Sequence, residues 1–161
     1  AESSGTNMKN EFPLEELDLI AYRKDLKVTE KDGKVFILDP VRKQYVKSTP
    51  EEFVRQLVVR WIMDHYGLGR GSISIEKQIT AGLRERRFDL LILDTTHEPW
   101  MLVECKAPDV VLTDKVWYQA TLYNRTIDAP YIWVTNGHSQ QLGAWNKDEN
   151  SYQAIKNFPI R

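Results

Sequence analysis

The order of apolar segments predicts an α/β fold in which a mixed β-sheet is flanked by helices. A helical segment at 50–66 precedes three strand-like segments, and a second helical segment at 113–128 separates these from a buried strand at 130–135. A strand that follows a helical crossover lies parallel to the strand before the helix. The aliphatic runs 90–93 and 132–134 are typical of strands that are buried on both faces.

The N-terminal part predicts a β-hairpin followed by a helix. Segments 28–30 and 35–38 flank Lys-Asp-Gly-Lys, in which Asp-Gly is a strong hairpin-turn signal. The helix has Thr49 as its N-cap, proline at the first helical position and Glu52 three residues after the cap. Gly67 is expected to end it.

The next segments supply the remaining sheet. Ile73, Ile75, Lys77 and Ile79 alternate as one strand, and two further strands follow at 88–93 and 100–106. In the second helix Thr113 is a candidate N-cap. Its expected inner face carries Val116, Ala120, Tyr123 and Ile127. The tail, residues 142–161, gives only weak strand signals.

Two carboxylates interrupt apolar strands, Asp89 in the first and Glu104 in the second. A carboxylate buried in such a run is costly unless it is paired. Antiparallel pairing about the loop 94–99 predicts three opposed pairs: Leu93 with Trp100, Leu91 with Leu102, and Asp89 with Glu104. Strand alternation places Lys106 on the face of Glu104 and turns Cys105 away from it.

This arrangement favours a metal site. Like charges directly opposed on a sheet destabilise it, and a divalent cation between them reverses that effect. Oxygen ligands indicate Mg²⁺ or Mn²⁺ rather than Zn²⁺. The residues alone leave an alternative, in which Asp89 pairs with Arg87 and Glu104 with Lys106 as a salt-bridged sheet edge.

Composition and charge limit the function classes. The 161 residues, 42% hydrophobic and 11% aromatic, predict one globular domain. We expect residues 1–7 to be a cloning remnant and residues 8–161 to form that domain. The net charge of −1 is not that of a strongly basic nucleic-acid binder, so such a function must rest on local charge, for example in residues 84–87.

The sequence also favours a cytoplasmic protein. No apolar run approaches the length of about 20 residues needed to span a membrane. Cys105 is the single cysteine and cannot form an internal disulfide, which favours a reducing compartment.

These motifs resemble the PD-(D/E)xK nuclease superfamily, with Asp89 and Glu104-Cys105-Lys106 on a hairpin that follows a helix. More specifically, the chain resembles the N-terminal nuclease domain of type I restriction enzyme R subunits. The segments that carry this resemblance are 50–56, 87–89, 104–108, 119–123 and 134–137. The resemblance implies a restriction-endonuclease-like core over about residues 50–137, with an added N-terminal hairpin. The namesake proline before the aspartate is Phe88 here.

The resemblance implies roles for the hairpin residues. Asp89 and Glu104 would hold Mg²⁺ or Mn²⁺, with the backbone carbonyl of Cys105 as a further oxygen ligand. Lys106 would position the attacking water or stabilise charge in the transition state.

Helical residues complete the implied site. Glu52 could reach the metal directly or through water, and Glu51 is the alternative nearer the cap. Gln119 and Tyr123 lie four residues apart on one helical face and could contact the metal-bound water or a phosphate.

The implied activity is that of a Mg²⁺-dependent endodeoxyribonuclease. The implied partners are DNA and a helicase or translocase, or other restriction-modification subunits, since no helicase motor motif is present. Two alternatives remain open: a catalytically silent nucleic-acid-binding domain and a protein-interaction module of the same fold.

Overall fold

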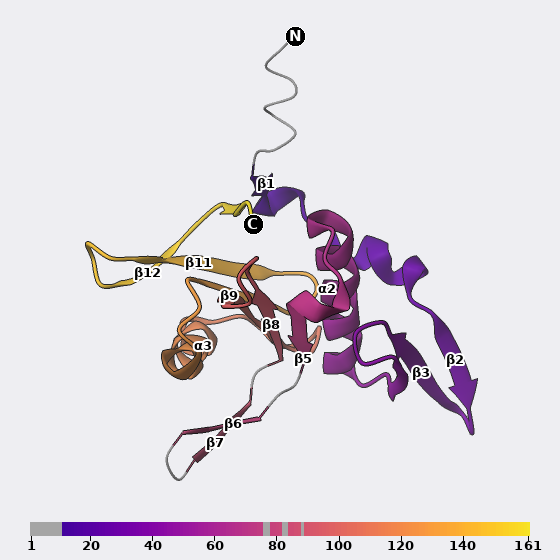
Figure 1. Cartoon of the computed structure of the whole chain (residues 1–161). Helices are drawn as coiled ribbons and strands as arrows, with labels where there is room; N and C mark the ends of the chain where they lie inside the picture. The colour runs from indigo at the N-terminus through magenta and orange to yellow at the C-terminus, as the bar shows by residue number, and fades with distance from the viewer. Residues whose placement is uncertain (1–10, 76–77, 82–83, 88) are drawn as a thin grey trace.

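A mixed β-sheet forms the centre of the computed structural model, which describes residues 11–75, 78–81, 84–87 and 89–161 (Figure 1). Within these residues the sheet has six strands in the order β12-β11-β10-β9-β8-β5. They are β5 (Ile73–Ile75), β8 (Leu90–Leu93), β9 (Pro99–Cys105), β10 (Tyr131–Thr135), β11 (Gln140–Asn146) and β12 (Ser151–Ala154). Strands β9 and β10 are parallel and the other neighbours antiparallel, which confirms the predicted mixed sheet.

Helix α2 (Pro50–Tyr66) has the predicted boundaries. The Thr49 hydroxyl accepts a hydrogen bond from the Glu52 backbone N–H at 3.1 Å, and so satisfies one of the donors left free at a helix start. Gly67 ends the helix with a φ of 64°, in the left-handed region that glycine adopts without steric cost.

Helix α3 (Asp114–Ile127) also begins after its predicted cap, Thr113, which accepts from the Val116 backbone N–H. It connects β9 to β10, and this crossover is why the two strands run parallel. The tail forms more regular structure than its sequence signals suggested, with β11, β12 and β13 (Asn157–Phe158). Strand β13 pairs with β1 (Phe12–Pro13).

The two helices cover opposite faces of the sheet (Figure 1). Buried α2 side chains, among them Val54, Leu57, Val58 and Ile62, pack with Met101, Val103 and Cys105 of β9. On the other face, Ala120 of α3 packs with Ile132 and Val134. Glu104 alternates with Val103 and Cys105, so it belongs to the α3 face.

The N-terminal hairpin is present but belongs to a three-stranded sheet. Two 3-10 helices, η1 (Leu14–Glu16) and η2 (Leu19–Asp25), precede β2 (Val28–Lys31), β3 (Lys34–Asp39) and β4 (Gln44–Lys47). Asp32 and Gly33 form the predicted turn with positive φ angles. The prediction missed β4, because its turn depends on Lys43 at a φ of 57°, a conformation that a lysine does not signal.

The predicted continuous strand at 73–79 is wrong. After η3 (Arg70–Ser72), β5 pairs with β8 of the central sheet, whereas β6 (Gln78–Ala81) pairs with β7 (Arg84–Arg87) in a separate hairpin. The apolar alternation continues through both strands, so it cannot reveal that the partner changes. The side chains of 76–88 fall outside the described part, and so does any contact of Arg87 with Asp89.

The pairing of β8 with β9 follows the predicted register except next to the loop. Leu91 lies opposite Leu102 as predicted, but Leu93 lies opposite Pro99 rather than Trp100 because the register shifts after Ile92. In the loop, the Asp94 carboxylate accepts hydrogen bonds from the backbone N–H groups of Thr96 and Glu98. None of the helices that the structure describes has the length and apolarity to cross a bilayer.

Candidate active site

Asp89 and Glu104 come together at the open end of the β8–β9 hairpin. The ladder ends with Leu90 opposite Val103, so the next pair in this register is Asp89 and Glu104. The Cys105 backbone N–H donates to Asp89 Oδ2 at 2.7 Å, which ties Asp89 to the strand that carries Glu104. The two carboxylates are therefore neighbours even though Asp89 precedes the first residue of β8.

Lys106 completes this group. Its Nζ lies 3.4 Å from Glu104 Oε2, as in the salt-bridge alternative, and its backbone N–H donates to the Thr135 carbonyl of β10. The hydrogen bond to β10 thus fixes the backbone of Lys106, and its ammonium lies next to Glu104.

Glu104 lies in an environment that disfavours its charge. The pKa of Glu104 is raised to about 7, first by burial and then by the negative charge of Asp89, and Lys106 only partly offsets both. The Lys106 ammonium at 3.4 Å is the cation paired with Glu104.

Arg55 of α2 links the hairpin to the helix. Its Nη2 donates to Asp89 Oδ1 at 2.9 Å and its Nη1 to Glu52 Oε1 at 2.5 Å, and only 8% of its side chain is exposed. Burial alone lowers the pKa of Arg55, but the hydrogen bond to Asp89 and the charge of Glu52 outweigh burial and raise it above its ordinary value. The guanidinium fork suits two carboxylates that approach from different elements.

The hydrogen bonds continue from Glu52 to the end of β3. Arg42 Nη2 donates to Glu52 Oε2 at 2.9 Å, and Arg42 Nε donates to Asp39 Oδ2 at 2.6 Å. Gln56 Nε2 donates to both of these carboxylates, at 3.0 Å each. We call this connected set the polar cluster; its members are Asp39, Arg42, Glu52, Arg55, Gln56 and Asp89.

The polar cluster changes the interpretation of Glu52. Both of its carboxylate oxygens accept hydrogen bonds from side chains of the cluster, and it reaches Asp89 through Arg55. Sequence reasoning placed Glu52 beside the site but assigned no role to Arg55 or Gln56. The available signal was the i, i+3 and i+4 spacing of Glu52, Arg55 and Gln56, which places three polar side chains on one face of the helix.

Gln119 and Tyr123 lie on α3 at different depths. Tyr123 packs with Leu91 and Leu102, which lie two residues from Asp89 and Glu104 on the same sheet face. Gln119 is exposed one turn earlier in the helix. Tyr123 is therefore next to the carboxylate face of the sheet, and a contact of Gln119 with the site remains a prediction.

Cys105 behaves as a core residue. Its side chain is buried among the residues packed against α2, and burial raises the pKa of its thiol. Only its backbone faces Asp89. Across the described residues, no group of three or more His, Cys, Asp or Glu side chains is arranged to hold a metal ion.

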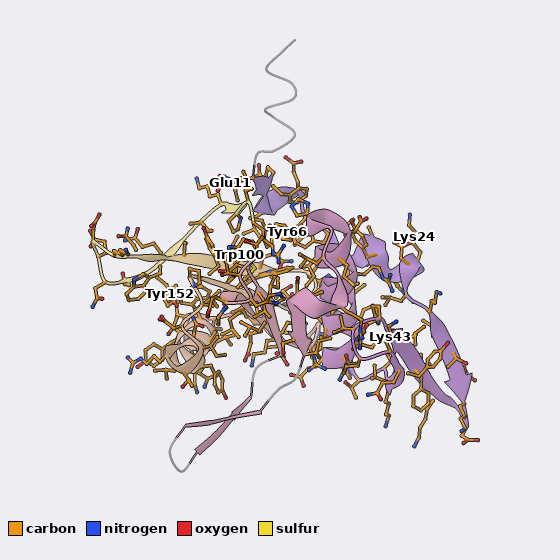
Figure 2. The ribbon with its side chains drawn as sticks, viewed as in Figure 1. Glu11, Lys24, Lys43, Tyr66, Trp100 and Tyr152 are labelled. Atoms are coloured by element: carbon orange, nitrogen blue, oxygen red, sulfur yellow. The ribbon has the colours of Figure 1, made fainter. Side chains whose placement is uncertain are left out.

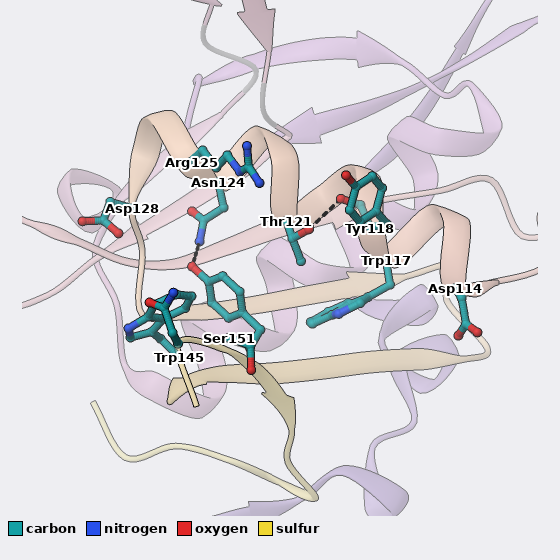
Figure 3. Close-up of a pocket in the computed structure, with 11 residues that line it drawn as sticks. Asp114, Trp117, Tyr118, Thr121, Asn124, Arg125, Asp128, Trp145 and Ser151 are labelled. Carbon is teal, nitrogen blue, oxygen red and sulfur yellow. Dashed lines mark hydrogen bonds between the residues drawn. The ribbon is translucent and has the colours of Figure 1, made fainter. Parts of the chain in front are cut away.

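A separate hollow of about 740 Å³ lies between α3 and the β11–β12 hairpin (Figure 3). Its lining includes Trp117, Tyr118, Arg125 and Trp145, and none of the predicted site residues. Within it the Asn124 amide donates to the Tyr152 hydroxyl and to the Ala129 carbonyl, which ties the end of α3 to β12. The hollow is therefore distinct from the carboxylate site.

The mixed sheet and the helices on its two faces define an α/β domain that carries two carboxylates and a lysine at the end of one hairpin. Residues 50–159 match the family described as the type I restriction enzyme R protein N terminus (HSDR_N). This match covers more than half of the chain, and the chain belongs to that family.

One solved structure is similar over part of its length. It is the fragment structure of a putative HsdR subunit of a type I restriction enzyme from Vibrio vulnificus YJ016, with a TM-score of 0.47 and 18% identity. The similarity covers 68% of this chain and 23% of that chain, so this chain spans about a quarter of that structure. A search of curated proteins gave no match.

Proposed function

We propose that this domain is a Mg²⁺- or Mn²⁺-dependent endonuclease that hydrolyses DNA phosphodiester bonds. The observation that carries the proposal is the position of Asp89 next to Glu104, with the Lys106 ammonium 3.4 Å from Glu104. Two carboxylates with one nearby ammonium suit metal-assisted hydrolysis, in which one group of residues holds the metal and another stabilises developing charge.

The donor set fits a hard divalent cation. Asp89 and Glu104 supply carboxylate oxygens, and each Asp89 oxygen that accepts one hydrogen bond keeps a second lone pair. The N–H and C=O groups of one strand residue point to the same side, so the Cys105 carbonyl faces the side where its N–H meets Asp89. Mg²⁺ keeps several waters, so two carboxylates and one carbonyl suffice for its site.

The roles follow from this placement. When bound, the metal would polarise a phosphodiester oxygen and lower the pKa of a bound water. Lys106 would orient that water or stabilise charge on the phosphate during attack. Arg55 would hold Asp89 in its orientation, and Glu52 would act on the site through Arg55.

Two further residues and the partners complete the proposal. Tyr123 and Gln119 would contact the phosphate or the metal-bound water from the α3 side. Residues 1–161 carry no helicase motor motif, so DNA translocation would need a motor that lies outside them. The expected partners besides DNA are a helicase or translocase and other restriction-modification subunits.

A catalytically silent domain is the second candidate, and one observation favours it. Both Asp89 oxygens already accept hydrogen bonds, from Arg55 and from the Cys105 N–H. If these contacts leave Asp89 no room for a cation, a calorimetric titration will detect no Mn²⁺ binding. Binding that Asp89→Asn or Glu104→Gln abolishes would instead support the metal site.

A plasmid-nicking assay with Mg²⁺ or Mn²⁺ tests the nuclease directly. The wild type should nick supercoiled plasmid, and Glu104→Ala should not. Glu98→Ala is the matched control because Glu98 is an exposed glutamate in the loop of the same hairpin, and it should nick at the wild-type rate. Equal nicking by Glu104→Ala and wild type would contradict the assignment.

A further inference from the structure

The N-terminal sheet carries a local positive charge that the chain as a whole lacks. We call β2, β3 and β4, with Lys27 before them, the wing; it lies outside the family match at 50–159. The wing, residues 27–47, contains six Lys or Arg and three Asp or Glu, a net charge of +3, whereas the whole chain has −1. In Figure 1 the wing projects toward the same end of the molecule as the β6–β7 hairpin.

The strand register sorts these charges onto one face. Lys31 lies opposite Lys34, Phe36 opposite Lys47, and the Lys27 carbonyl accepts from the Leu38 N–H. Four exposed lysines, Lys27, Lys31, Lys34 and Lys47, therefore share one face of the wing with Tyr45, of which 51% is exposed. Glu30 pairs with Val35 and lies on the other face.

The pairing of Lys31 with Lys34 does not serve stability. Like charges directly opposed on antiparallel strands destabilise the sheet. The opposite face, which carries the buried Ile37 and Asp39, provides the attachment to the rest of the protein. The lysine face thus lowers the stability of the fold, and its positive charge suits an anionic partner.

The base of the wing is fixed to the candidate active site through the polar cluster. Asp39 at the end of β3 accepts from Gln56 of α2, and Arg42 in the β3–β4 turn donates to Glu52. Arg55 then connects Glu52 to Asp89. Figure 2 labels Lys43 at this end of the wing. A partner held on the wing is thereby held at a defined position relative to Asp89.

We propose that the lysine face of the wing binds the phosphate backbone of duplex DNA without reading its sequence. From Lys27 to Lys31 the strand extends about 13 Å, at roughly 3.3 Å per residue. Duplex DNA presents one negative charge per about 1.7 Å of its axis, so several phosphates lie within that span. The choice of DNA as the anion rests on the proposed nuclease function.

The test compares two triple variants that remove the same charge from different places. Lys31→Gln, Lys34→Gln and Lys47→Gln neutralise the wing, and Lys115→Gln, Lys147→Gln and Lys156→Gln neutralise exposed lysines elsewhere. Binding of a fluorescent duplex is measured by anisotropy in EDTA, where no cleavage occurs, over a range of salt concentrations. Thermal unfolding checks that the wing variant is at least as stable as the wild type, since it loses the Lys31–Lys34 repulsion.

We expect the wing variant to bind about tenfold or more weakly at low salt and its log–log salt slope to shrink by about 2 to 3, since each lost phosphate contact removes about 0.9. The control variant should bind within about twofold of the wild type. Equal losses in both variants, or no loss in either, would overturn the proposal. So would wing-dependent binding to vesicles of phosphatidylserine and phosphatidylcholine without binding to DNA.

The nicking assay separates this inference from the proposed catalysis. If the protein binds DNA through the wing but never nicks it, the proposed nuclease activity is overturned and the proposed role of the wing is supported. If nicking depends on Glu104 but DNA affinity does not depend on the wing, the nuclease activity is supported and the role of the wing is overturned.

Discussion

The N-terminal and C-terminal halves of helix α2 bury their inward-facing side chains by opposite chemistry. In its first turns, Glu52, Arg55 and Gln56 are buried through ion pairs and hydrogen bonds of the polar cluster. In its later turns, Trp61 packs edge-on against Trp133 at 5.5 Å between ring centroids and tilts against Phe158 at 4.7 Å. We call Trp61, Trp133 and Phe158 the aromatic cluster.

The difference indicates which end supports the fold and which supports the site. Burial of aromatic surface is directly favourable, whereas a buried ion pair loses much of its Coulomb energy to desolvation. A helix start made of apolar residues would serve stability as well. The polar cluster instead fixes Asp89 and the base of the wing. We therefore infer that its role is to position these two parts of the molecule rather than to stabilise the fold.

Trp61→Ala should give the largest loss of stability. Removing a large, fully packed aromatic side chain leaves a cavity and typically costs about 3–5 kcal/mol in the free energy of unfolding. Urea unfolding measures it, and Ile62→Val in the same buried stretch is the mild control, at about 0.5–1.5 kcal/mol. Nicking per folded molecule should be unchanged, and a specific loss of activity would contradict the division between the two ends.

Lys106→Ala should lower the cleavage rate by about 10²–10³, which is the usual effect of removing one electrostatic donor. Its effect on unfolding should be small because Glu104, whose pKa is already about 7, takes up a proton when the ammonium is removed. Mn²⁺ affinity measured by calorimetry should be largely kept. Full activity, with Glu104→Ala inactive as a check for contamination, would show that Lys106 has no role in cleavage.

Arg55→Met should destabilise the protein by about 3 kcal/mol, at the low end for a broken buried pair. The low end applies because Asp89 is 21% exposed and Glu52 keeps Arg42 and Gln56. Arg55→Lys keeps the charge but not the fork, so it should recover only part of the stability. If Arg55→Met unfolds like the wild type and still binds Mn²⁺ with the wild-type affinity, Arg55 does not position Asp89.

The sequence was sufficient for the parts of the fold that depend on local signals. Caps at Thr49 and Thr113 and the glycine at 67 located both helices, and the apolar periods located β8, β9 and β10. The turn at Lys43 and the change of pairing partner between β5 and β6 were not predicted, because neither has a local sequence signature. Strand pairing is decided by tertiary contacts.

The candidate site divides in the same way. Asp89, Glu104 and Lys106 were found because a charge in an apolar strand is conspicuous and because register relates the two strands. Arg55 and Arg42 escaped, since an arginine on an amphipathic helix or in a turn ordinarily faces solvent. Both arginines are held in place by carboxylates from three separate elements of the fold. The hydrophobic periodicity of a sequence does not reveal such long-range contacts.

Glu104→Gln should change how stability depends on pH. The pKa of Glu104 is about 7 in the folded protein against an ordinary value of 4.5, mainly through burial and then through Asp89. Between these values the folded state binds more protons than the unfolded state, so stability falls as pH rises through this window. The wild type should therefore lose on the order of 3 kcal/mol from this group between about pH 4.5 and pH 7, and the variant should not.

Urea unfolding of wild type and Glu104→Gln at a series of pH values measures this difference, because all other titrating groups are common to both proteins. Glu98→Gln, at an exposed loop position, should follow the wild type. Above pH 7 the Glu104 carboxylate is charged, so Mg²⁺ should raise the Tm of the wild type and not that of Glu104→Gln. Parallel pH profiles, or equal Tm shifts with Mg²⁺, would mean that the charge of Glu104 is already balanced by Lys106, and then the hairpin end is an ordinary salt-bridged sheet edge.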